Sequence, residues 1–189
     1  MSVRNEQDLE LYFIALIPHE KLRDEIRAVK ERMRDLYGAG HALRSPAHIT
    51  LQKPFKRDRN AWRAISGALH LFTQTEKPFT VELDGYGAFA PRVIYIKLKE
   101  KRHIATLHER LKALLLSSLD FAPDEIMKDV EPHITVATRD LTREAFSEAW
   151  PVISGEPFTG SFVVRSIFLL KHNGRYWEIL EEFHFRGDE

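Results

Sequence analysis

Two pairs of histidine and threonine are the residues of this chain best suited to chemistry. His48 and Thr50 lie in the sequence AHITL, and His133 and Thr135 lie 85 residues later in PHITV. Because successive side chains of a strand point to opposite faces, each His shares a face with its Thr, and the apolar neighbours share the other face. Each copy therefore predicts a strand with an apolar back and a front that carries an imidazole and a hydroxyl.

Two such fronts that face each other would suit phosphoester chemistry. A neutral imidazole can remove a proton from an attacking hydroxyl or water, and a protonated one can donate a proton to the departing oxygen. Each proton transfer contributes a factor of about 10² to 10⁴ in rate. The hydroxyls of Thr50 and Thr135 could donate hydrogen bonds to phosphoryl oxygens. Arg139 lies an even number of residues after His133 and would share its face if the strand extends that far. Its guanidinium could then donate two hydrogen bonds to a phosphate, but a surface arginine at the strand end fits equally well.

A single His-x-Thr sequence has an ordinary explanation, because the polar face of any half-buried strand can look this way. The second copy points to function only if its surroundings repeat as well. They do: the order strand, helix, His-x-Thr strand, helix, Pro-Phe-Thr, strand occurs twice, from about residue 10 to 90 and from 91 to 186. Duplication of one unit explains this order, and an approximate two-fold axis would bring the two polar faces together.

The elements of both repeats follow from apolar periodicity and from the positions of Gly and Pro. The first repeat predicts a strand at 11–17 buried on both faces, a helix at 22–36 ended by Gly38 and Gly40, the first motif strand to Pro54, a helix at 62–72 and a strand that ends in a turn at 85–87. The second predicts a strand at 93–96 with Tyr95 aligned to Tyr12, a helix at 104–114, a loop at 121–130, the second motif strand, a helix at 142–150 capped by Thr142, and a hairpin of strands at 162–170 and 176–185.

Length and composition favour one domain with two lobes over residues 1–189. The chain is 43% hydrophobic, enough for a substantial core, and contains no cysteine. The lack of cysteine excludes disulfides, thiolate nucleophiles and cysteine zinc sites, and it is compatible with a reducing cytoplasm. The polar N-terminus and the short apolar run at 11–17 lack the features of a signal peptide or a membrane span. We therefore expect a soluble, cytoplasmic monomer without a membrane partner.

The charge balance limits the size of a phosphate ligand. Lys and Arg number 28, as do Asp and Glu, whereas proteins that wrap long nucleic acids are usually strongly basic. A phosphate ligand is therefore expected to be small or to be the end of a longer chain. Basic residues do cluster after the first motif, either as a solvated surface or as the rim of a phosphate site: Lys53, Lys56, Arg57, Arg59 and Arg63.

Other candidate residues carry weaker signals. The seven remaining histidines, His41 and His108 among them, show no zinc spacing and are predicted to be surface or packing residues. Tyr86, Phe89 and Trp177 could stack on a base, although aromatic residues of such strands more often belong to the core.

The two His-x-Thr sequences, each flanked by apolar residues, resemble the paired signature of the two-histidine phosphoesterase superfamily, which includes 2′-5′ RNA ligases and 2′,3′-cyclic nucleotide phosphodiesterases. The resemblance covers nearly the whole chain, and GYGAFAP followed by VIYIK is most similar to a less characterised bacterial branch. It implies an α+β fold with two pseudo-two-fold lobes, whose antiparallel sheets line a central cleft and whose helices lie outside. It also implies that His48 and His133 are catalytic, that Thr50 and Thr135 bind phosphate, and that no metal or other cofactor is needed.

We therefore expect a metal-independent phosphoesterase that hydrolyses 2′,3′-cyclic phosphates of nucleotides or RNA ends, or that makes or breaks 2′-5′ linkages. Arg139 and Tyr86 are expected to add substrate contacts. In hydrolysis His133 would activate water and His48 would protonate the leaving oxygen, and ligation would exchange these roles. The alternative is a binding module that holds a nucleotide monophosphate without turnover, and a third possibility is a scaffold with vestigial histidines.

Overall fold

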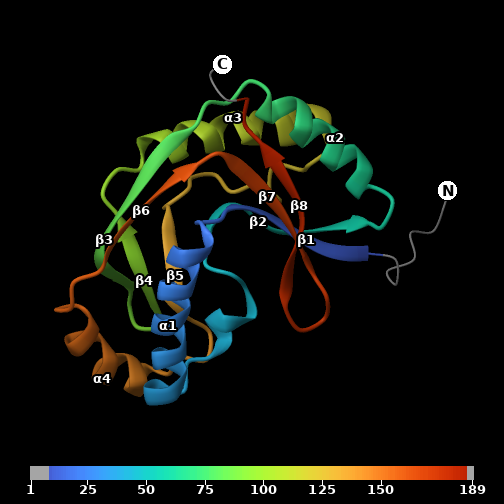
Figure 1. The fold of residues 1–189 in the computed structure, drawn as a ribbon. Helices are drawn as coiled ribbons and strands as arrows, with labels where there is room; N and C mark the ends of the chain where they lie inside the picture. Colours follow the sequence, from blue (N-terminus) through green and yellow to red (C-terminus); the bar gives the residue numbers. More distant parts are fainter. Residues whose placement is uncertain (1–8, 187–189) are drawn as a thin grey trace.

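The computed structural model describes residues 9–186 and shows an α+β fold (Figure 1). The N-terminal residues 1–8, part of the segment expected to lack an export signal, and residues 187–189 lie outside this range. The strands are β1 (Leu9–Leu16), β2 (Ile49–Asp58), β3 (Phe79–Phe89), β4 (Val93–Leu98), β5 (His133–Ala137), β6 (Thr159–Val164), β7 (Ser166–His172) and β8 (Trp177–His184). The helices are α1 (Glu20–Tyr37), the short 3₁₀ helix η2 (His41–Arg44), α2 (Trp62–Thr73), α3 (Arg102–Ser118) and α4 (Arg143–Ile153).

The described strands form two four-stranded sheets in which every neighbouring pair is antiparallel. One sheet has the order β2-β1-β7-β8 and the other has the order β5-β4-β3-β6. The two motif strands, β2 and β5, are therefore edge strands, and they contact each other. The sheets thus meet along the two strands that carry the His-x-Thr sequences.

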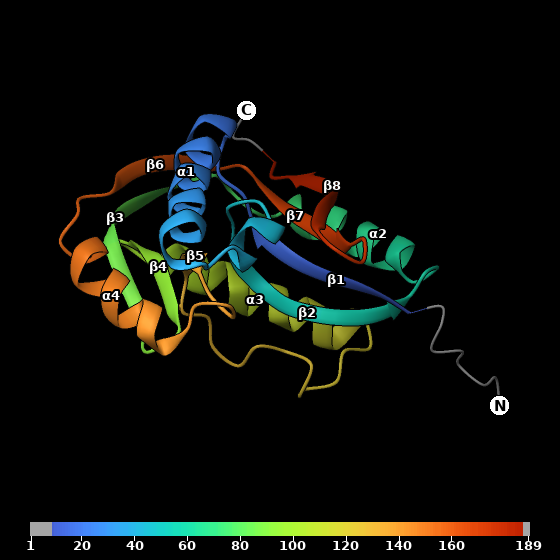
Figure 2. The ribbon, with the colours of Figure 1, turned by 90° about the horizontal axis from the view of Figure 1, so that it is seen from below.

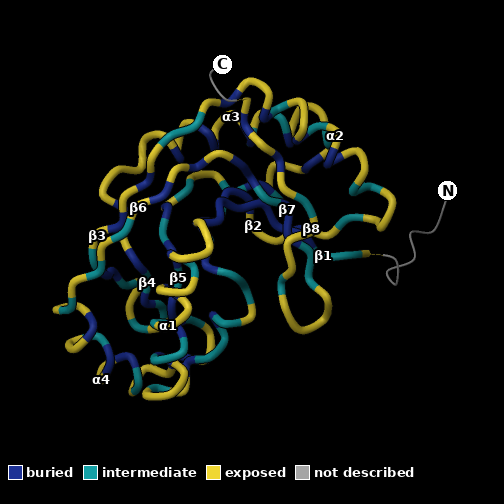
Figure 3. Tube along the Cα trace, in the orientation of Figure 1, coloured by how far each residue is buried: buried dark blue, intermediate teal, exposed yellow. Residues whose placement is uncertain are grey.

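The motif strands have the predicted apolar backs and polar fronts. The apolar residues of the motifs are fully buried: Ile49, Leu51, Ile134 and Val136. The polar residues are half-buried: His48, Thr50, His133 and Thr135. Burial of one such apolar side chain contributes about 1.5–3 kcal/mol, so a one-residue slip that turned the imidazoles into the core would be costly. The apolar backs therefore hold the imidazoles toward the front. Buried positions gather in the central strands, and the outer faces of the helices are exposed (Figure 3).

Strand β1 is buried on both faces, as its continuous apolar run predicts. Tyr12, Ile14 and Leu16 belong to the main core, which extends over both sheets. Phe13 and Ala15 point to the other face, where they join a small apolar cluster against which Trp177 packs. That second cluster forms part of the floor of the site described below.

Helices α1 and α3 each pack against the motif strand of the other repeat. Helix α1 packs against β5 and β6, whereas α2 packs against β8 and α3 packs against β2 (Figure 2). Strand β3 also belongs to the first repeat in sequence but to the second sheet in space. The boundaries of the sheets therefore differ from those of the sequence repeats.

Helix ends follow local signals. Gly38 ends α1 in the left-handed conformation, with φ 69°, and its backbone N–H donates to the carbonyl of Arg34. Thr142 caps α4 by accepting a hydrogen bond from Ala145 N, as predicted. Leu36, the last residue of the predicted apolar stripe of α1, is 65% exposed, and the buried face of the helix ends at Met33. None of the helices within residues 9–186 is long and apolar enough to cross a bilayer.

Three predicted strand limits were wrong. The run 162–170 is divided at Arg165 into β6 and β7, which join different sheets, so only β7 and β8 form the final hairpin. Strand β2 continues past Pro54, because proline is tolerated on an edge strand. Strand β3 continues through Gly85, where a register shift absorbs the glycine, and the turn follows Phe89 instead.

The alignment of Tyr95 with Tyr12 was also wrong. In the sheet register, Tyr95 lies opposite Thr135, and the residue opposite Thr50 is Ala15. Tyr12 points into the main core, but Tyr95 lies on the face that carries His133.

Candidate active site

A cleft of about 170 Å³ brings together residues from both motifs. His48 and Thr50 of the first motif, Thr135 of the second motif, and Arg139 line it. His133 lies close enough to His48 for its charge to lower the pKa of His48. The two polar fronts therefore meet at one place, which is the juxtaposition that the duplication predicts.

Both imidazoles are held by the same type of hydrogen bond. Nδ1 of His48 lies 2.8 Å from the carbonyl oxygen of Pro46, and Nδ1 of His133 lies 2.6 Å from the carbonyl oxygen of Glu131. A carbonyl oxygen only accepts, so each Nδ1 carries the proton and donates it. Each Nε2 is then left to exchange a proton with a ligand.

Aromatic rings pack beside each imidazole. The ring of Phe13 lies 4.9 Å from that of His48, and the ring of Tyr95 lies 4.9 Å from that of His133. Phe89 also contacts His133 at 5.1 Å. These rings restrict the imidazoles to a few orientations and reduce their contact with water.

Burial lowers the pKa of both histidines. It lowers the pKa of His48 to about 4, and the nearby charges of Lys30 and His133 act in the same direction. It also lowers the pKa of His133, although Glu131 opposes the change. Both imidazoles are therefore mostly neutral at pH 7 in the free protein, and a bound phosphate anion would restore proton affinity to the pair.

Lys30 stabilises the segment that leads to His48 through two hydrogen bonds. Its side chain is buried, and Nζ donates hydrogen bonds of 2.9 Å to the carbonyl of Ala42 and 3.1 Å to that of Ser45. Burial lowers the pKa of Lys30 to about 8, with a further contribution from Arg27. One ammonium thus holds η2 and the chain just before the first motif strand.

Arg139 lies at the cleft, but not for the reason that the sequence suggested. Strand β5 ends at Ala137, and Arg139 follows it in a turn with a left-handed backbone, φ 56°. The carboxylate of the next residue, Asp140, accepts a hydrogen bond of 2.7 Å from the backbone N–H of His41. The turn is therefore anchored to η2 across the cleft.

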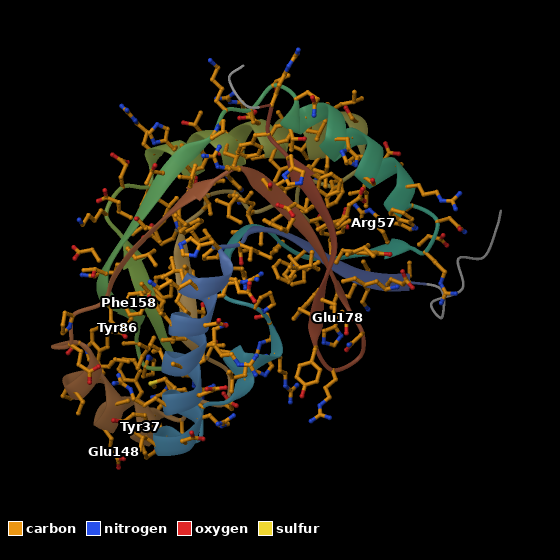
Figure 4. All side chains as sticks on the ribbon, viewed as in Figure 1. Tyr37, Arg57, Tyr86, Glu148, Phe158 and Glu178 are labelled. Atoms are coloured by element: carbon orange, nitrogen blue, oxygen red, sulfur yellow. The ribbon has the colours of Figure 1, made fainter. Side chains whose placement is uncertain are left out.

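The structure places Tyr86 away from the cleft, contrary to its predicted role in substrate binding. Its side chain is 7% exposed and belongs to the main core, where its ring lies 5.8 Å from that of Phe158 (Figure 4). The alternation of β3 shifts at Gly85, which turns Tyr86 inward. Of the other aromatic candidates, Phe89 contacts His133 and Trp177 lines the cleft.

The basic residues after the first motif hold neighbouring segments in place. Arg57 forms hydrogen bonds of 2.6 and 3.0 Å with the carboxylate of Glu125 and lies over the ring of Phe121 at 3.9 Å. Lys53 donates to the carbonyl of Asp124, and Arg59 pairs with Glu10. None of the five basic residues lines the cleft, so they do not form its rim.

Several residues of the cleft carry no recognisable sequence signal. His41, predicted to be a surface or packing residue, lines the cleft together with Arg44 and Ser45 of the same segment. Their position depends on the hydrogen bonds of Lys30 and Asp140, which join residues distant in sequence. Phe13 lies in the continuous apolar run of β1, in which no alternation distinguishes it from its neighbours. Within the described residues, no group of three or more His, Cys, Asp or Glu side chains is arranged to hold a metal ion.

The family model of the 2′-5′ RNA ligase superfamily matches residues 18–175 of this chain, a range that includes both motifs. The chain belongs to that superfamily. The resemblance inferred from the two His-x-Thr sequences is therefore confirmed. Bacterial proteins named as putative phosphoesterases are also similar over two thirds or more of the chain.

A protein of Bacillus pumilus strain SAFR-032, named "Putative phosphoesterase", is 32% identical over 131 residues, which cover 68% of this chain and 70% of the relative. A protein of Geobacillus sp. strain WCH70 with the same description is 27% identical over 182 residues, which cover 94% and 98%.

Solved structures confirm the fold of this member of the superfamily. The protein TT0787 of Thermus thermophilus matches with a TM-score of 0.69 and 24% identity, covering 95% of this chain and all (100%) of its own. LigT of E. coli, solved in complex with 3′-AMP, matches with a TM-score of 0.66 and 19% identity, covering 94% and 98%. At these identities the similarity concerns the fold.

Proposed function

We propose that this protein is a phosphodiesterase that hydrolyses 2′,3′-cyclic phosphates of nucleotides or RNA ends without a metal ion. The observation that carries the proposal is the meeting of the two motifs at one cleft, with both Nδ1 atoms donating to backbone carbonyls. His48 lines the cleft and His133 lies beside it, and because Nδ1 of each is held by a backbone carbonyl, Nε2 is the atom that would transfer a proton. The complex of LigT with 3′-AMP supports a nucleotide as the ligand class.

The reaction would use one imidazole as base and the other as acid. The base takes a proton from water as its oxygen attacks phosphorus, and the acid gives a proton to the ribose oxygen as its bond to phosphorus breaks. The lower pKa of His48 favours His48 as the neutral base and His133 as the acid, which is the reverse of the assignment expected from the sequence. In ligation the same two groups would exchange roles.

The remaining polar groups of the cleft would bind the phosphate. Within the described residues, the hydroxyls of Thr50 and Thr135 form no hydrogen bond to another group of the protein, and both residues line the cleft. Each hydroxyl can therefore donate to a phosphoryl oxygen. Arg139 would offset the negative charge that develops there as water attacks, because a preorganised guanidinium binds oxyanions strongly.

The proposal is tested by incubating the protein with 2′,3′-cyclic AMP in EDTA and following the nucleoside monophosphate product. We expect turnover by the wild type, a loss of about 10² to 10⁴ in kcat for His48→Ala and for His133→Ala, and no loss for His70→Ala. His70 is a matched control because it lies on α2, bonded to Glu181 and outside the cleft.

The binding-module alternative predicts a different result. Nucleotide binding measured by calorimetry, without product and with affinity retained in either histidine variant, would favour that alternative and contradict the enzyme. Absence of both binding and product would leave only the scaffold interpretation.

A further inference from the structure

A second pocket adjoins the cleft on the other side of the segment that leads to His48. It measures about 320 Å³, is lined on one side by α1 and reaches the hairpin of β7 and β8 at Tyr176. Arg44, Ser45 and Trp177 line both this pocket and the cleft. A ligand that passes Arg44 and Trp177 would therefore occupy both spaces, so we call the second one the α1 pocket.

The α1 pocket has an excess of positive charge. Arg23, Arg27, Lys30 and Arg44 line it, as do two carboxylates, those of Glu20 and Asp24. Arg27 forms an ion pair of 3.1 Å with Glu31, and the ammonium of Lys30 is bonded to backbone carbonyls.

Two of these cations have no ionic partner among the residues that the structure describes. Among residues 9–186, the guanidinium groups of Arg23 and Arg44 form no ion pair and no hydrogen bond. Arg23 is half-buried and Arg44 is exposed. Guanidinium groups placed in this way match the geometry of phosphate oxygens, which they bind as a fork.

We propose that the α1 pocket binds the phosphodiester on the 5′ side of the reacting nucleotide, so that the substrate is the end of an oligoribonucleotide. This inference rests on the proposed function. In a 2′,3′-cyclic phosphate both the 2′ and the 3′ oxygens are bonded to the reacting phosphorus. The rest of an RNA chain can therefore leave the cleft only through the 5′ oxygen, and the α1 pocket is the adjoining space with unpaired cations.

The aromatic residues of the pocket fit the same ligand. Tyr176 is 41% exposed, and Trp177 is half-buried where the two spaces meet. Exposed aromatic faces stack on bases of single strands without a strong sequence preference. The zero net charge of the chain agrees with contact to one or two phosphates near an RNA end and not with a long tract.

The test compares three substrates with the same reacting group: 2′,3′-cyclic AMP, the same nucleotide with a 5′-phosphate, and the dinucleotide ApA with a 2′,3′-cyclic phosphate. For the wild type we expect kcat/KM to be about tenfold higher for the dinucleotide than for 2′,3′-cyclic AMP. Arg23→Gln is expected to remove this advantage while kcat/KM for 2′,3′-cyclic AMP stays within about twofold. If the nucleotide with a 5′-phosphate shows the same increase in kcat/KM as the dinucleotide, the α1 pocket binds a phosphate monoester, and the proposed diester ligand is wrong.

Arg34→Gln is the matched control, because Arg34 lies on the same helix but pairs with Asp35 on the surface. It should retain the preference for the dinucleotide. Salt provides a second readout: the plot of log kcat/KM against log salt should be steeper for the dinucleotide by about 0.7 per phosphate contacted, and Arg23→Gln should reduce the difference.

Failure of the inference and failure of the proposed function give different results. Equal kcat/KM for 2′,3′-cyclic AMP and the dinucleotide, or an equal loss for both in Arg23→Gln, overturns the inference and leaves the phosphodiesterase intact. No turnover of any substrate overturns the proposed function. In that case calorimetry with 3′-AMP and with ApA 3′-phosphate decides the inference, which fails if the two bind equally well.

Discussion

Gly87 lies beneath the ring of Tyr95. A Cβ atom on Gly87 would be 2.5 Å from Cε2 and 2.6 Å from Cζ of that ring, a separation that real Cβ atoms do not show. The same ring packs 4.9 Å from the imidazole of His133. The missing Cβ of Gly87 therefore lets Tyr95 lie across the sheet and support a predicted catalytic residue.

Gly87→Ala should displace Tyr95 and disturb the orientation of His133. We expect kcat for 2′,3′-cyclic AMP to fall by about tenfold or more, because a misoriented imidazole transfers protons poorly. Gly67→Ala is the control: a Cβ there meets nothing within 4 Å, and it replaces glycine within helix α2, so activity should be unchanged and stability slightly higher. Unchanged activity in Gly87→Ala would show that Tyr95 has no positioning role.

Arg139→Gly should separate activity from stability. The backbone of Arg139 has φ 56°, which costs roughly 1–2 kcal/mol for a residue with a side chain and little for glycine. We expect kcat/KM to fall by about 10² because the guanidinium is lost, while the melting temperature measured by circular dichroism does not fall. Arg139→Gln keeps the strained backbone, so it should lose activity without the gain in stability that glycine gives. A large loss of stability in Arg139→Gly would contradict the backbone strain at this position, and an unchanged kcat/KM would contradict the role of the guanidinium.

The pH dependence of kcat/KM should have its maximum on the acid side of neutrality. The active form of the free enzyme has one neutral and one protonated imidazole, so it exists between the two apparent pKa values of the pair. The lower value is about 4 for His48, and that of His133 is below its ordinary 6.5. We therefore expect kcat/KM to rise near pH 4 and to fall before pH 7, as measured with 2′,3′-cyclic AMP. A plateau of kcat/KM from pH 7 to 9 would contradict catalysis by one neutral and one protonated imidazole.

Lys30→Met should change how stability depends on pH. The pKa of Lys30 is about 8 in the folded protein, below the ordinary 10.5, so between these values the unfolded chain binds more protons. The free energy of unfolding of the wild type should therefore rise over that range relative to Lys30→Met, by up to roughly 3 kcal/mol. Urea unfolding at several pH values measures the difference. Parallel pH curves for the two proteins would mean that the ammonium is not desolvated.

The sequence predicted the local structure of the site better than the contacts that complete it. The faces of the two motif strands and the cap at Thr142 were predicted correctly, because each depends on residues within a few positions. Tyr86 was misplaced because a shift of strand register at Gly85 is not visible in a pattern of alternation. Arg139 reaches the cleft from a turn, although its parity suggested a strand.

What the sequence by itself determined is the pair of half-buried strands, each with an imidazole and a hydroxyl on its front, because side-chain alternation and an apolar back act within one strand. Only the tertiary structure decided which segments surround them. The division of 162–170 between two sheets, the ties from Lys30 to Ala42 and Ser45, and the α1 pocket all depend on pairings between residues distant in the chain. Such pairings are selected by the packing of the whole core, and no local pattern encodes them.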